Sequence, residues 1–450
     1  MRGAPRRGTW RGEPWADRGG VQADTLDLAR WQFALTAGGH FLFVSLTIGL
    51  ATILAVLQTR ATLRGARPVH LRMVRFWGQL YVINYAIGIV TGLVMEFQFG
   101  MAWAGLGEFG GDVFGASLAL ETVLAFFVES TFLALWLLGW DRFNKWVHLG
   151  VLWVVTLTAY LSAYWILVTN GFLNHPAGHA TTSDGTLELA DPGALMTNPS
   201  TLLAFGHVVA GALLTAALFM AGVSAYHLFR RAGPDEDGFH RRSLRLGVYT
   251  ALPALFVTVS FGGVQQGRLG EWQPMKLAVL ENDTAEIARL QAELAERFGP
   301  GDYVPPEALT RGAGMLMMTV FALIMFPLLV SVVLAAFRRA VHGFRAWHVL
   351  LMALVPLPYV AMIAGWVFRE AGRQPWVIYG LLRTEDAVSD VPTAQMWVSF
   401  GVFVPLFALL VVVNWWLLLR WARRGPQAQA PGAEDRIALA GPERREPSWS

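Results

Sequence analysis

The sequence predicts an all-α integral membrane protein with about nine transmembrane helices. The chain of 450 residues is 54% hydrophobic and only 15% charged, whereas an average soluble domain has about 25% charged residues. Many apolar runs approach the length of about twenty residues that a helix needs to cross a bilayer. No hydrophilic stretch is long enough for a separate soluble domain, so we expect a multi-pass membrane protein.

The composition also excludes several classes of site. The chain has no cysteine, which rules out disulfides, iron–sulfur clusters and thiolate-bound metals, and leaves His, Met, Glu and Asp as metal ligands. The net charge is +3, and the basic residues fall in short loops between apolar runs. Nucleic acid is therefore not expected as a partner.

Two polar segments flank the predicted membrane domain, which covers residues 25–421. Residues 1–24 are basic and lack the apolar core of a secretory signal, so we expect a disordered extension, or a start codon assigned upstream of the natural one. Residues 422–450 are rich in Pro, Ala and Arg and are expected to form a disordered cytoplasmic tail.

The apolar runs and the basic loops predict the order and orientation of the spans. The spans are expected near residues 31–58, 76–97, 117–140, 147–170, 201–229, 246–264, 309–337, 349–368 and 396–421. The loop after the first span is rich in arginine, which places it in the cytoplasm. Loops 100–115 and 171–200 have no Lys or Arg and are expected outside. The amino terminus is thus predicted outside and the carboxyl terminus in the cytoplasm.

The longest polar loop, residues 265–309, connects the sixth and seventh predicted spans. It contains a charged segment, residues 284–298, that is expected to be helical. Loops of this length are usually functional.

Two carboxylates lie at membrane depth in the third predicted span. In a regular helix Glu121 and Glu129 are about 12 Å apart along the axis and about 80° apart around it, so they share one face. Intramembrane acids normally face a bundle interior or a wet cavity and mark proton paths. The alternative is that each is protonated and hydrogen-bonded to a neighbouring helix. Glu96 is a third acid beside an apolar segment.

Three candidate metal ligands are predicted to lie at a similar depth. His40 is in the outer half of the first span, His207 is near the outer end of the fifth, and Glu370 is at the outer end of the eighth. The chain also has 19 Trp and 28 Phe, which can line flat pockets. This combination favours haem, whose iron takes axial His or Met. A bare metal ion is less favoured, because no closely spaced pair of histidines is present.

A series of motifs resembles subunit I of the cytochrome bd-type quinol oxidases. In chain order they are Gln32–Phe43, Met95–Gly100, Gly111–Gly115, Glu121–Ser130, Gly139–Arg142, Gln273–Ala278 and Gly372–Trp376. The resemblance implies a multi-pass protein of the bacterial plasma membrane that takes electrons from membrane quinol and reduces dioxygen to water, with protons from the cytoplasm. It also implies a second multi-span subunit (subunit II) as a partner, and a small single-span subunit as a further candidate.

The resemblance implies three cofactors: a low-spin haem b, a high-spin haem b, and a haem d or third haem b. His40 and Glu370 match the axial ligands of the two high-spin haems, and His207 matches one ligand of the low-spin haem. Trp366 matches an aromatic residue between the haems, and Arg373 matches a base near the haem propionates.

The resemblance also assigns proton-transfer and quinol-binding residues. Glu121, Glu129 and Ser162 match the proton path, and Glu96 is grouped with them as a further acid. The quinol-binding residues of loop 265–309 would be Gln273, Lys276 and Glu281.

One motif departs from the family pattern. The family has a methionine ligand for the low-spin haem just after an arginine at the start of the seventh span. Here, alignment on Arg311 places Ala313 at that position, and alignment on the Gly-x-Gly pair places Thr310 there. Met315 is the first candidate replacement, with Met317 or Met318 as alternatives, and all three can also be core thioethers.

Two rival functions stay open at this point. The chain could be a haem-bearing oxidase subunit that uses a donor other than quinol, or a proton-coupled transporter.

Overall fold

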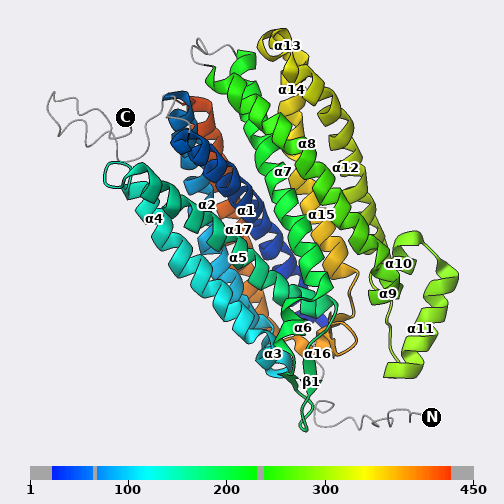
Figure 1. Cartoon of the computed structure of the whole chain (residues 1–450). Coiled ribbons are helices and arrows are strands. Elements are labelled where there is room, and N and C mark those ends of the chain that lie inside the picture. The colour runs from blue at the N-terminus through cyan, green and yellow to red at the C-terminus, as the bar shows by residue number, and fades with distance from the viewer. Residues whose placement is uncertain (1–22, 64–67, 231–237, 427–450) are drawn as a thin grey trace, which may run out of the picture.

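The protein is a bundle of long helices (Figure 1). The computed structural model describes residues 23–63, 68–230 and 238–426; the expectations for residues 1–22 and 427–450 lie outside this part of the chain. Within these residues, nine helical segments are long and apolar enough to cross a membrane, which confirms the predicted fold class. They are α1 (Ala23–Leu63), α2 (Pro68–Ala102), α3 (Ala104–Thr122) with η1 (Val123–Glu129) and α4 (Ser130–Leu138), α5 (Lys145–Asn174), α7 (Pro199–Arg230), α8 (Phe239–Gly267), α12 (Glu307–Ala336), α14 (Arg345–Leu354) with α15 (Leu357–Ala371), and α17 (Thr393–Arg424).

Basic residues gather at one end of the bundle. The connection from α4 to α5 carries Arg142, and the short helix α13 (Arg338–Gly343) begins with two arginines. Both lie at the upper end of the bundle in Figure 1. We call this the arginine-rich end. Its assignment to the cytoplasm, and the orientation of both termini, stay predictions.

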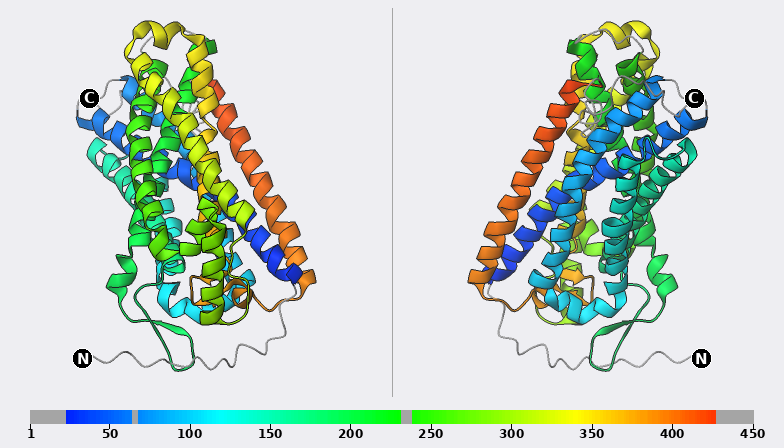
Figure 2. Two further views of the ribbon diagram at one scale, coloured as in Figure 1. Left: turned by 90° about the vertical axis from the view of Figure 1, so that its right-hand side faces the viewer. Right: turned by 90° about the vertical axis from the view of Figure 1, so that its left-hand side faces the viewer.

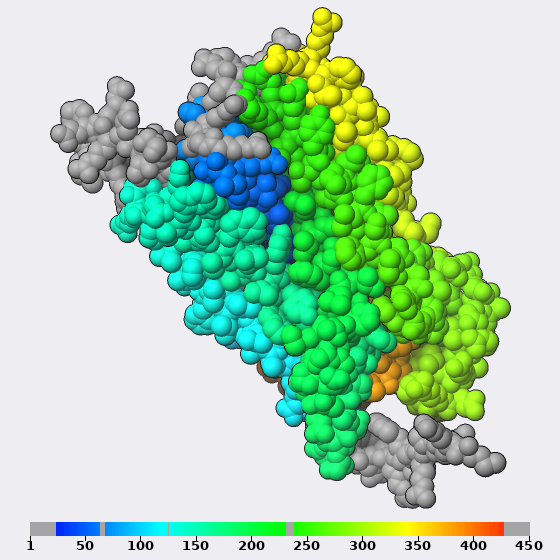
Figure 3. Space-filling model, viewed as in Figure 1, coloured from blue at the N-terminus to red at the C-terminus, as the bar shows by residue number. Residues whose placement is uncertain are grey.

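The opposite end is covered by short elements. Loop 265–309 forms α9 (Leu269–Trp272), α10 (Pro274–Glu281) and α11 (Thr284–Phe298), and this lobe projects beside the end of α8 in Figure 3. The helix expected over residues 284–298 is thus confirmed. Two antiparallel pairs, β1 (His179–Thr181) with β2 (Leu187–Leu189) and β3 (Trp376–Ile378) with β4 (Leu382–Arg383), complete this end, together with α6 (Pro192–Met196) and α16 (Thr384–Ala387).

Three expectations about the helices were wrong in detail. Residues 100–115 are not an extended loop, because α3 begins at Ala104; the glycines that suggested a loop are accommodated in a helix. The eighth span is divided into α14 and α15 at Val355–Pro356, since proline cannot continue the hydrogen bonding of the preceding helix. The third span contains the π-helix η1, so it is not the regular α-helix assumed above.

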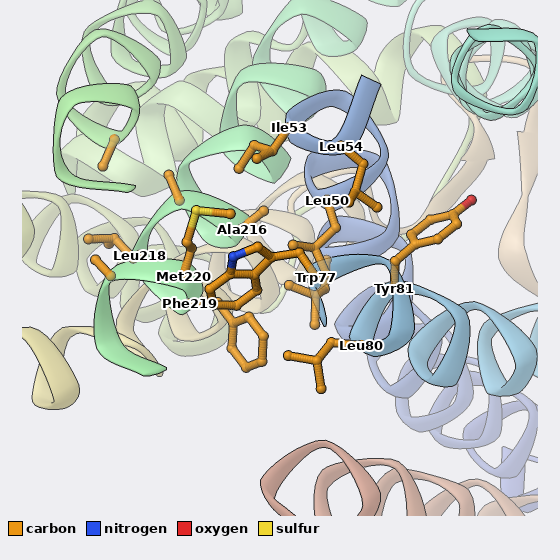
Figure 4. Close-up of a cluster of buried hydrophobic side chains, with 14 of the residues drawn as sticks. Leu50, Ile53, Leu54, Trp77, Leu80, Tyr81, Ala216, Leu218, Phe219 and Met220 are labelled. Carbon is orange, nitrogen blue, oxygen red and sulfur yellow. The ribbon is translucent and has the colours of Figure 1, made fainter. Parts of the chain in front are cut away.

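The larger of the buried hydrophobic clusters lies in the half of the bundle nearer the arginine-rich end, and a second one lies toward the opposite end, around Trp103, Phe114 and Phe172. Figure 4 shows the larger cluster between α1, α2 and α7, where Leu50, Leu54, Trp77 and Leu80 are all fully buried. The Trp77 ring donates its Nε1–H to Ser243 of α8 at 3.2 Å. In a membrane, helices associate through close packing and hydrogen bonds of this kind, because lipid is as apolar as the core.

Helix α17 lies along one side of the bundle, with its end nearer α16 beside the start of α1 (Figure 2). Asn84 of α2 ties it to the bundle: its Nδ2 donates to the Phe43 carbonyl at 2.7 Å and to the Thr47 hydroxyl at 2.9 Å of α1. Asn414 of α17 donates in turn to Asn84 Oδ1 at 3.1 Å. Three helices thus share one buried polar junction.

Helices α1 and α7 approach each other closely at Gly49, so a larger residue at this position should destabilise the protein. A Cβ at this position would lie 2.1 Å from the Ala212 carbonyl oxygen and 2.6 Å from the Ala216 Cβ. Gly49→Ala should therefore push the two helices apart and destabilise the protein by about 1–3 kcal/mol or more. Thermal unfolding of the detergent-purified protein would show this as a lower Tm. Gly150→Ala is the matched control, since nothing lies within 4 Å of its added Cβ; equal Tm values for both variants would contradict the packing argument.

Candidate functional site

A cavity of about 1520 Å³ occupies the part of the bundle away from the arginine-rich end. Ordinary small-molecule pockets are about 300–1,000 Å³, so this one has room for more than one group. The cavity brings together thirteen of the fifteen candidate site residues: His40, Glu96, Glu121, Glu129, Ser162, His207, Gln273, Lys276, Met317, Met318, Trp366, Glu370 and Arg373. Met315 and Glu281 are not among the lining residues.

The hydrogen bonds of His40 fix which ring nitrogen is available to a ligand. The Thr91 hydroxyl donates to the Gly88 carbonyl at 2.8 Å, so it accepts from His40 Nδ1–H at 2.9 Å. In that tautomer Nε2 keeps its lone pair. Gly92 lies against the ring, because a Cβ there would be 3.2 Å from His40 Cε1. The arrangement is typical of a metal-binding histidine held by an outer hydrogen bond.

His207 has the same design on α7. Its Nδ1 donates to the Thr258 carbonyl of α8 at 2.8 Å, which leaves Nε2 as the acceptor nitrogen. Gly262, one turn further along α8, makes room for the ring: a Cβ would be 3.1 Å from His207 Cε1. Both candidate histidines are therefore presented to the cavity with a free Nε2.

Glu370 is the last residue but one of α15 and lies inside a cluster of buried polar groups. One carboxylate oxygen accepts from Asn170 Nδ2 at 2.9 Å, and the other pairs with Arg373, which is 5% exposed. The carboxyl group is thus directed by two partners on different elements. Arg373 also donates to the Trp376 carbonyl at 3.3 Å, while its Nε is buried without a partner.

Aromatic rings line the part of the cavity around Trp366. Trp366 packs edge-on against Phe41 of α1, with ring centroids 5.3 Å apart, and lies 6.2 Å from Phe33. Phe33 in turn contacts Phe99 and Trp103 at the end of α2. Such walls suit a flat, apolar group rather than a hydrated ion.

The acids of the third span meet partners from three other helices. Glu121 accepts a hydrogen bond from Ser162 of α5 at 2.8 Å. Thr122 donates to Glu96 of α2, which lies within interaction range of Glu121. The predicted grouping of Glu96, Glu121 and Ser162 therefore exists as a connected polar cluster.

Glu129 lies deeper, and only 4% of it is exposed. The Tyr81 hydroxyl donates to its carboxyl at 3.2 Å; in Figure 4 this hydroxyl points away from the packed residues of α1 and α7. Glu129 is the last residue of η1, and short π-helical segments are frequent at functional sites. Although the turn is not the regular one assumed from the sequence, both Glu121 and Glu129 line the cavity.

Lys276 and Gln273 of loop 265–309 reach the cavity, whereas Glu281 does not. Lys276 is 3% exposed and donates to the Arg369 carbonyl at 3.0 Å. Burial, together with the neighbouring Arg369 and Arg373, holds the pKa of Lys276 well below its ordinary value. Glu281 ends α10 on the exposed side. The i,i+5 spacing that separates the two side chains on a helix explains why they do not meet.

The three methionine candidates on α12 differ in their position relative to the cavity. Met315 is 53% exposed and faces away from the cavity, so the structure does not support it as the low-spin ligand. Met317 and Met318 do line the cavity, and Gly365 makes room for Met317, since a Cβ there would lie 2.7 Å from its Sδ. Thr310 is fully buried outside the cavity lining.

Two polar residues of the site were missed by the sequence analysis. Arg369 precedes Glu370 and lines the cavity; its Nε donates to Asn170 Oδ1 at 2.7 Å. Asn170 therefore holds both Arg369 and Glu370. The only signal in the sequence was an arginine beside an acid at the end of a span, which is also typical of a charge at the membrane boundary.

The donor set fits haem better than a bare ion. Among the described residues there is no group of three or more His, Asp or Glu side chains that could hold a metal ion by themselves. Single axial donors in an aromatic-lined cavity suit an iron whose other ligands come from a porphyrin. Arg373, which lines the cavity, adds a positive charge that suits an anionic group.

Comparisons with known proteins show which family this chain resembles. The family model described as "Cytochrome bd terminal oxidase subunit I" matches residues 28–302 and 292–426. The chain is 35% identical to cytochrome bd ubiquinol oxidase subunit 1 of Bacillus subtilis (strain 168), over 89% of this chain and 94% of that protein. It is 32% identical to cytochrome bd-II ubiquinol oxidase subunit 1 of Escherichia coli (strain K12), over 90% and 98%. The bd oxidase structure from Geobacillus thermodenitrificans matches with a TM-score of 0.78 and 27% identity, over 90% of this chain and 99% of that chain.

The outer hydrogen bond of His40 generates a prediction. Thr91→Val removes the acceptor for Nδ1–H while keeping the shape of the side chain, so the imidazole is no longer held. Loss of such an outer partner typically weakens metal binding about 10–100-fold. Haem transfer to an excess of a haem-scavenging protein would measure this as faster loss. Thr91→Ser, which keeps the hydroxyl, should lose haem at the wild-type rate. If Thr91→Val also loses haem at the wild-type rate, the assigned tautomer is contradicted.

Proposed function

Because the chain belongs to the cytochrome bd terminal oxidase subunit I family, we propose that it is the subunit in which membrane quinol is oxidised and dioxygen is reduced to water. The family match confirms the resemblance predicted from the motifs, and with it the multi-pass location in the membrane. The observation that carries the proposal is that one cavity is lined by both candidate histidines, Glu370 and Lys276. The transporter alternative is set aside, since the relatives are oxidases.

Haem is the cofactor of this family, and we propose three sites for it in this chain. His40 and Glu370 would hold the two high-spin haems, a haem b and a haem d or third haem b. His207 would hold the low-spin haem b, with Met317 or Met318 as the second ligand in place of the family's methionine. Haem supplies one-electron transfer and, at an open iron position, the binding of dioxygen. The protein's contribution is the fixed orientation of each axial donor and a dry, aromatic-lined space.

We propose that Glu129 and Glu121 carry protons toward the dioxygen site. Glu129, which accepts from Tyr81, is nearer the arginine-rich end, and Glu121, which accepts from Ser162, is one step further into the cavity. Each carboxyl can hold a proton and pass it on when its partner rotates. A supply from the arginine-rich end would take protons from the cytoplasm if the predicted orientation holds.

We propose that quinol binds where α10 meets the cavity. Quinol oxidation must release two protons, and burial lowers the pKa of an amine, which favours its neutral, proton-accepting form. Lys276 lines the cavity, and its pKa is lowered in this way. Gln273 anchors the same segment, since its Nε2 donates to the Asn174 carbonyl at 2.8 Å. Glu281 would act from the exposed side, as an acceptor for departing protons rather than as a wall of the cavity.

The bd oxidases are multi-subunit complexes, and we propose that this chain works with a second multi-span subunit. Apolar side chains are exposed along η1 and α4, among them Phe126, Phe127 and Leu138. Lipid or a partner helix must cover such a face. A small single-span subunit is a further candidate partner.

The proton path generates a prediction. Glu121→Gln and Glu129→Gln keep the size and hydrogen bonding of the side chain but cannot relay a proton, so oxygen reduction should slow at least tenfold while protein level and haem content stay at wild-type values. Oxygen uptake by membranes, normalised to haem absorbance, measures it. Glu271→Gln, on the exposed surface, is the control, and wild-type turnover in both buried variants would restore the purely structural interpretation of these acids.

The quinol site generates a second prediction, which tests the proposed function. Lys276→Ala should depress quinol-driven oxygen uptake strongly, and Glu281→Ala more weakly because it lies outside the cavity. Uptake driven by a small artificial reductant that feeds the haems directly should stay near wild type in both. If both activities fall together in Lys276→Ala, or neither falls, quinol does not bind at α10, and a different electron donor has to be sought.

A further inference from the structure

Arg369 influences Lys276, but the proposed function gives its guanidinium no ligand of its own. Its guanidinium makes three contacts, all with neutral oxygens: Asn170 Oδ1 at 2.7 Å, Ser200 Oγ at 3.1 Å and Gln265 Oε1 at 3.5 Å. These partners come from α5, α7 and α8, so the side chain is held at the meeting point of three helices. The part of Arg369 that remains accessible lines the cavity.

The charges around Arg369 do not balance. Lys276, Arg369 and Arg373 surround one carboxylate, Glu370, and that carboxylate is already paired with Arg373. Even with Lys276 neutral, two guanidinium groups share one negative charge. An arginine stays charged when it is buried, and a charge taken out of water needs a counter-charge. The cluster therefore has an excess of positive charge that an additional anion would neutralise.

Arg373 adds a second guanidinium group to the cavity wall. It is 5% exposed, and like Arg369 it lines the cavity. Its Nε is covered by protein atoms and donates to no atom among the described residues, so an anion in the cavity would meet the accessible atoms of the two side chains. Guanidinium groups bind carboxylates through their N–H donors, and two of them beside one carboxylate favour a further anionic partner.

Arg369 stands between two of the candidate ligands. It is one residue before Glu370, and its charge is close enough to act on both the Glu370 carboxylate and the His207 imidazole. His207 is the ligand whose second partner on α12 departs from the family pattern. A charge in this position can influence the group bound at either ligand.

We infer that Arg369 binds a carboxylate group of the porphyrin held by His207, and that its positive charge also acts on the group bound at Glu370. The inference rests on the proposed function, since it needs haem in the cavity. A porphyrin with two carboxylates supplies the anionic oxygens that the cluster lacks. A nearby positive charge also stabilises the electron added on reduction, so Arg369 raises the reduction potential of this haem.

The test is a spectroelectrochemical titration of the complete oxidase in membranes. Arg369→Gln keeps a hydrogen-bonding side chain but removes the charge. In this variant the one-electron equilibrium of one haem b should shift at least tenfold toward the oxidised form. A tenfold shift lowers the reduction potential by about 59 mV. In Arg369→Lys, which keeps the charge, the shift should be less than tenfold. If Arg369→Gln does not assemble, the Lys variant decides: retained haem with a shift below tenfold supports the inference, and a larger shift overturns it.

Two controls separate charge from structure. Ser200→Ala removes a hydrogen-bond partner and leaves the charge, so its potentials should match wild type; a shift as large as that of Arg369→Gln would overturn the electrostatic role. Arg268→Gln removes an exposed arginine and should change nothing. If Arg369→Gln leaves every haem potential unchanged in protein with a normal haem spectrum, the inference fails and the proposed function stands. If wild-type protein shows no haem spectrum, the proposed function itself fails.

Discussion

Charged side chains and proposed metal ligands at membrane depth must find every partner within the protein, because lipid supplies no hydrogen bonds. This requirement explains the pairing in the cavity. His40 is held by Thr91, His207 by the Thr258 carbonyl, Glu370 by Asn170 and Arg373, and Glu129 by Tyr81. Each partner comes from a different helix from the residue it holds, except Arg373. The polar contacts of the site are thus also contacts that join the bundle.

Close packing of helices α1, α7 and α8 and the large cavity are found in different parts of the bundle. Nearer the arginine-rich end, glycine and alanine let α1, α7 and α8 approach closely, and large side chains such as Trp77 fill the remaining space. Toward the other end the helices surround a cavity. There the short elements provide the contacts that the open interior does not: Tyr303 stacks on Trp376 with ring centroids 5.8 Å apart, and Arg383 pairs with Tyr303. Residues 298–303 are thereby fastened to the loop after α15.

Hydropathy and charge were sufficient to predict the nine spans, because a bilayer demands long apolar helices regardless of their neighbours. Local detail was less accessible. The π-helix leaves no mark in an apolar run, and the helical start of α3 was hidden by glycines that are typical of loops. Among the proposed ligands, His40 and His207 could be singled out because histidine is rare in apolar spans. Met315, Met317 and Met318 could not be ranked, since their directions depend on where α12 packs against α15. Arg369 was missed because a charge at the end of a span has a simpler explanation.

The π-helix between Glu121 and Glu129 has a consequence for how this span can change. A π-segment accommodates extra residues in a helix without breaking it, so residues after η1 are rotated about the axis relative to those before it. The direction in which Glu129 points is therefore set separately from that of Glu121. A single-residue deletion in Val123–Val128 would restore regular turns and rotate Glu129 and Trp136 together, while Glu121 and its contact with Ser162 stayed in place. The direction of the Glu129 side chain can therefore change while that of Glu121 stays the same.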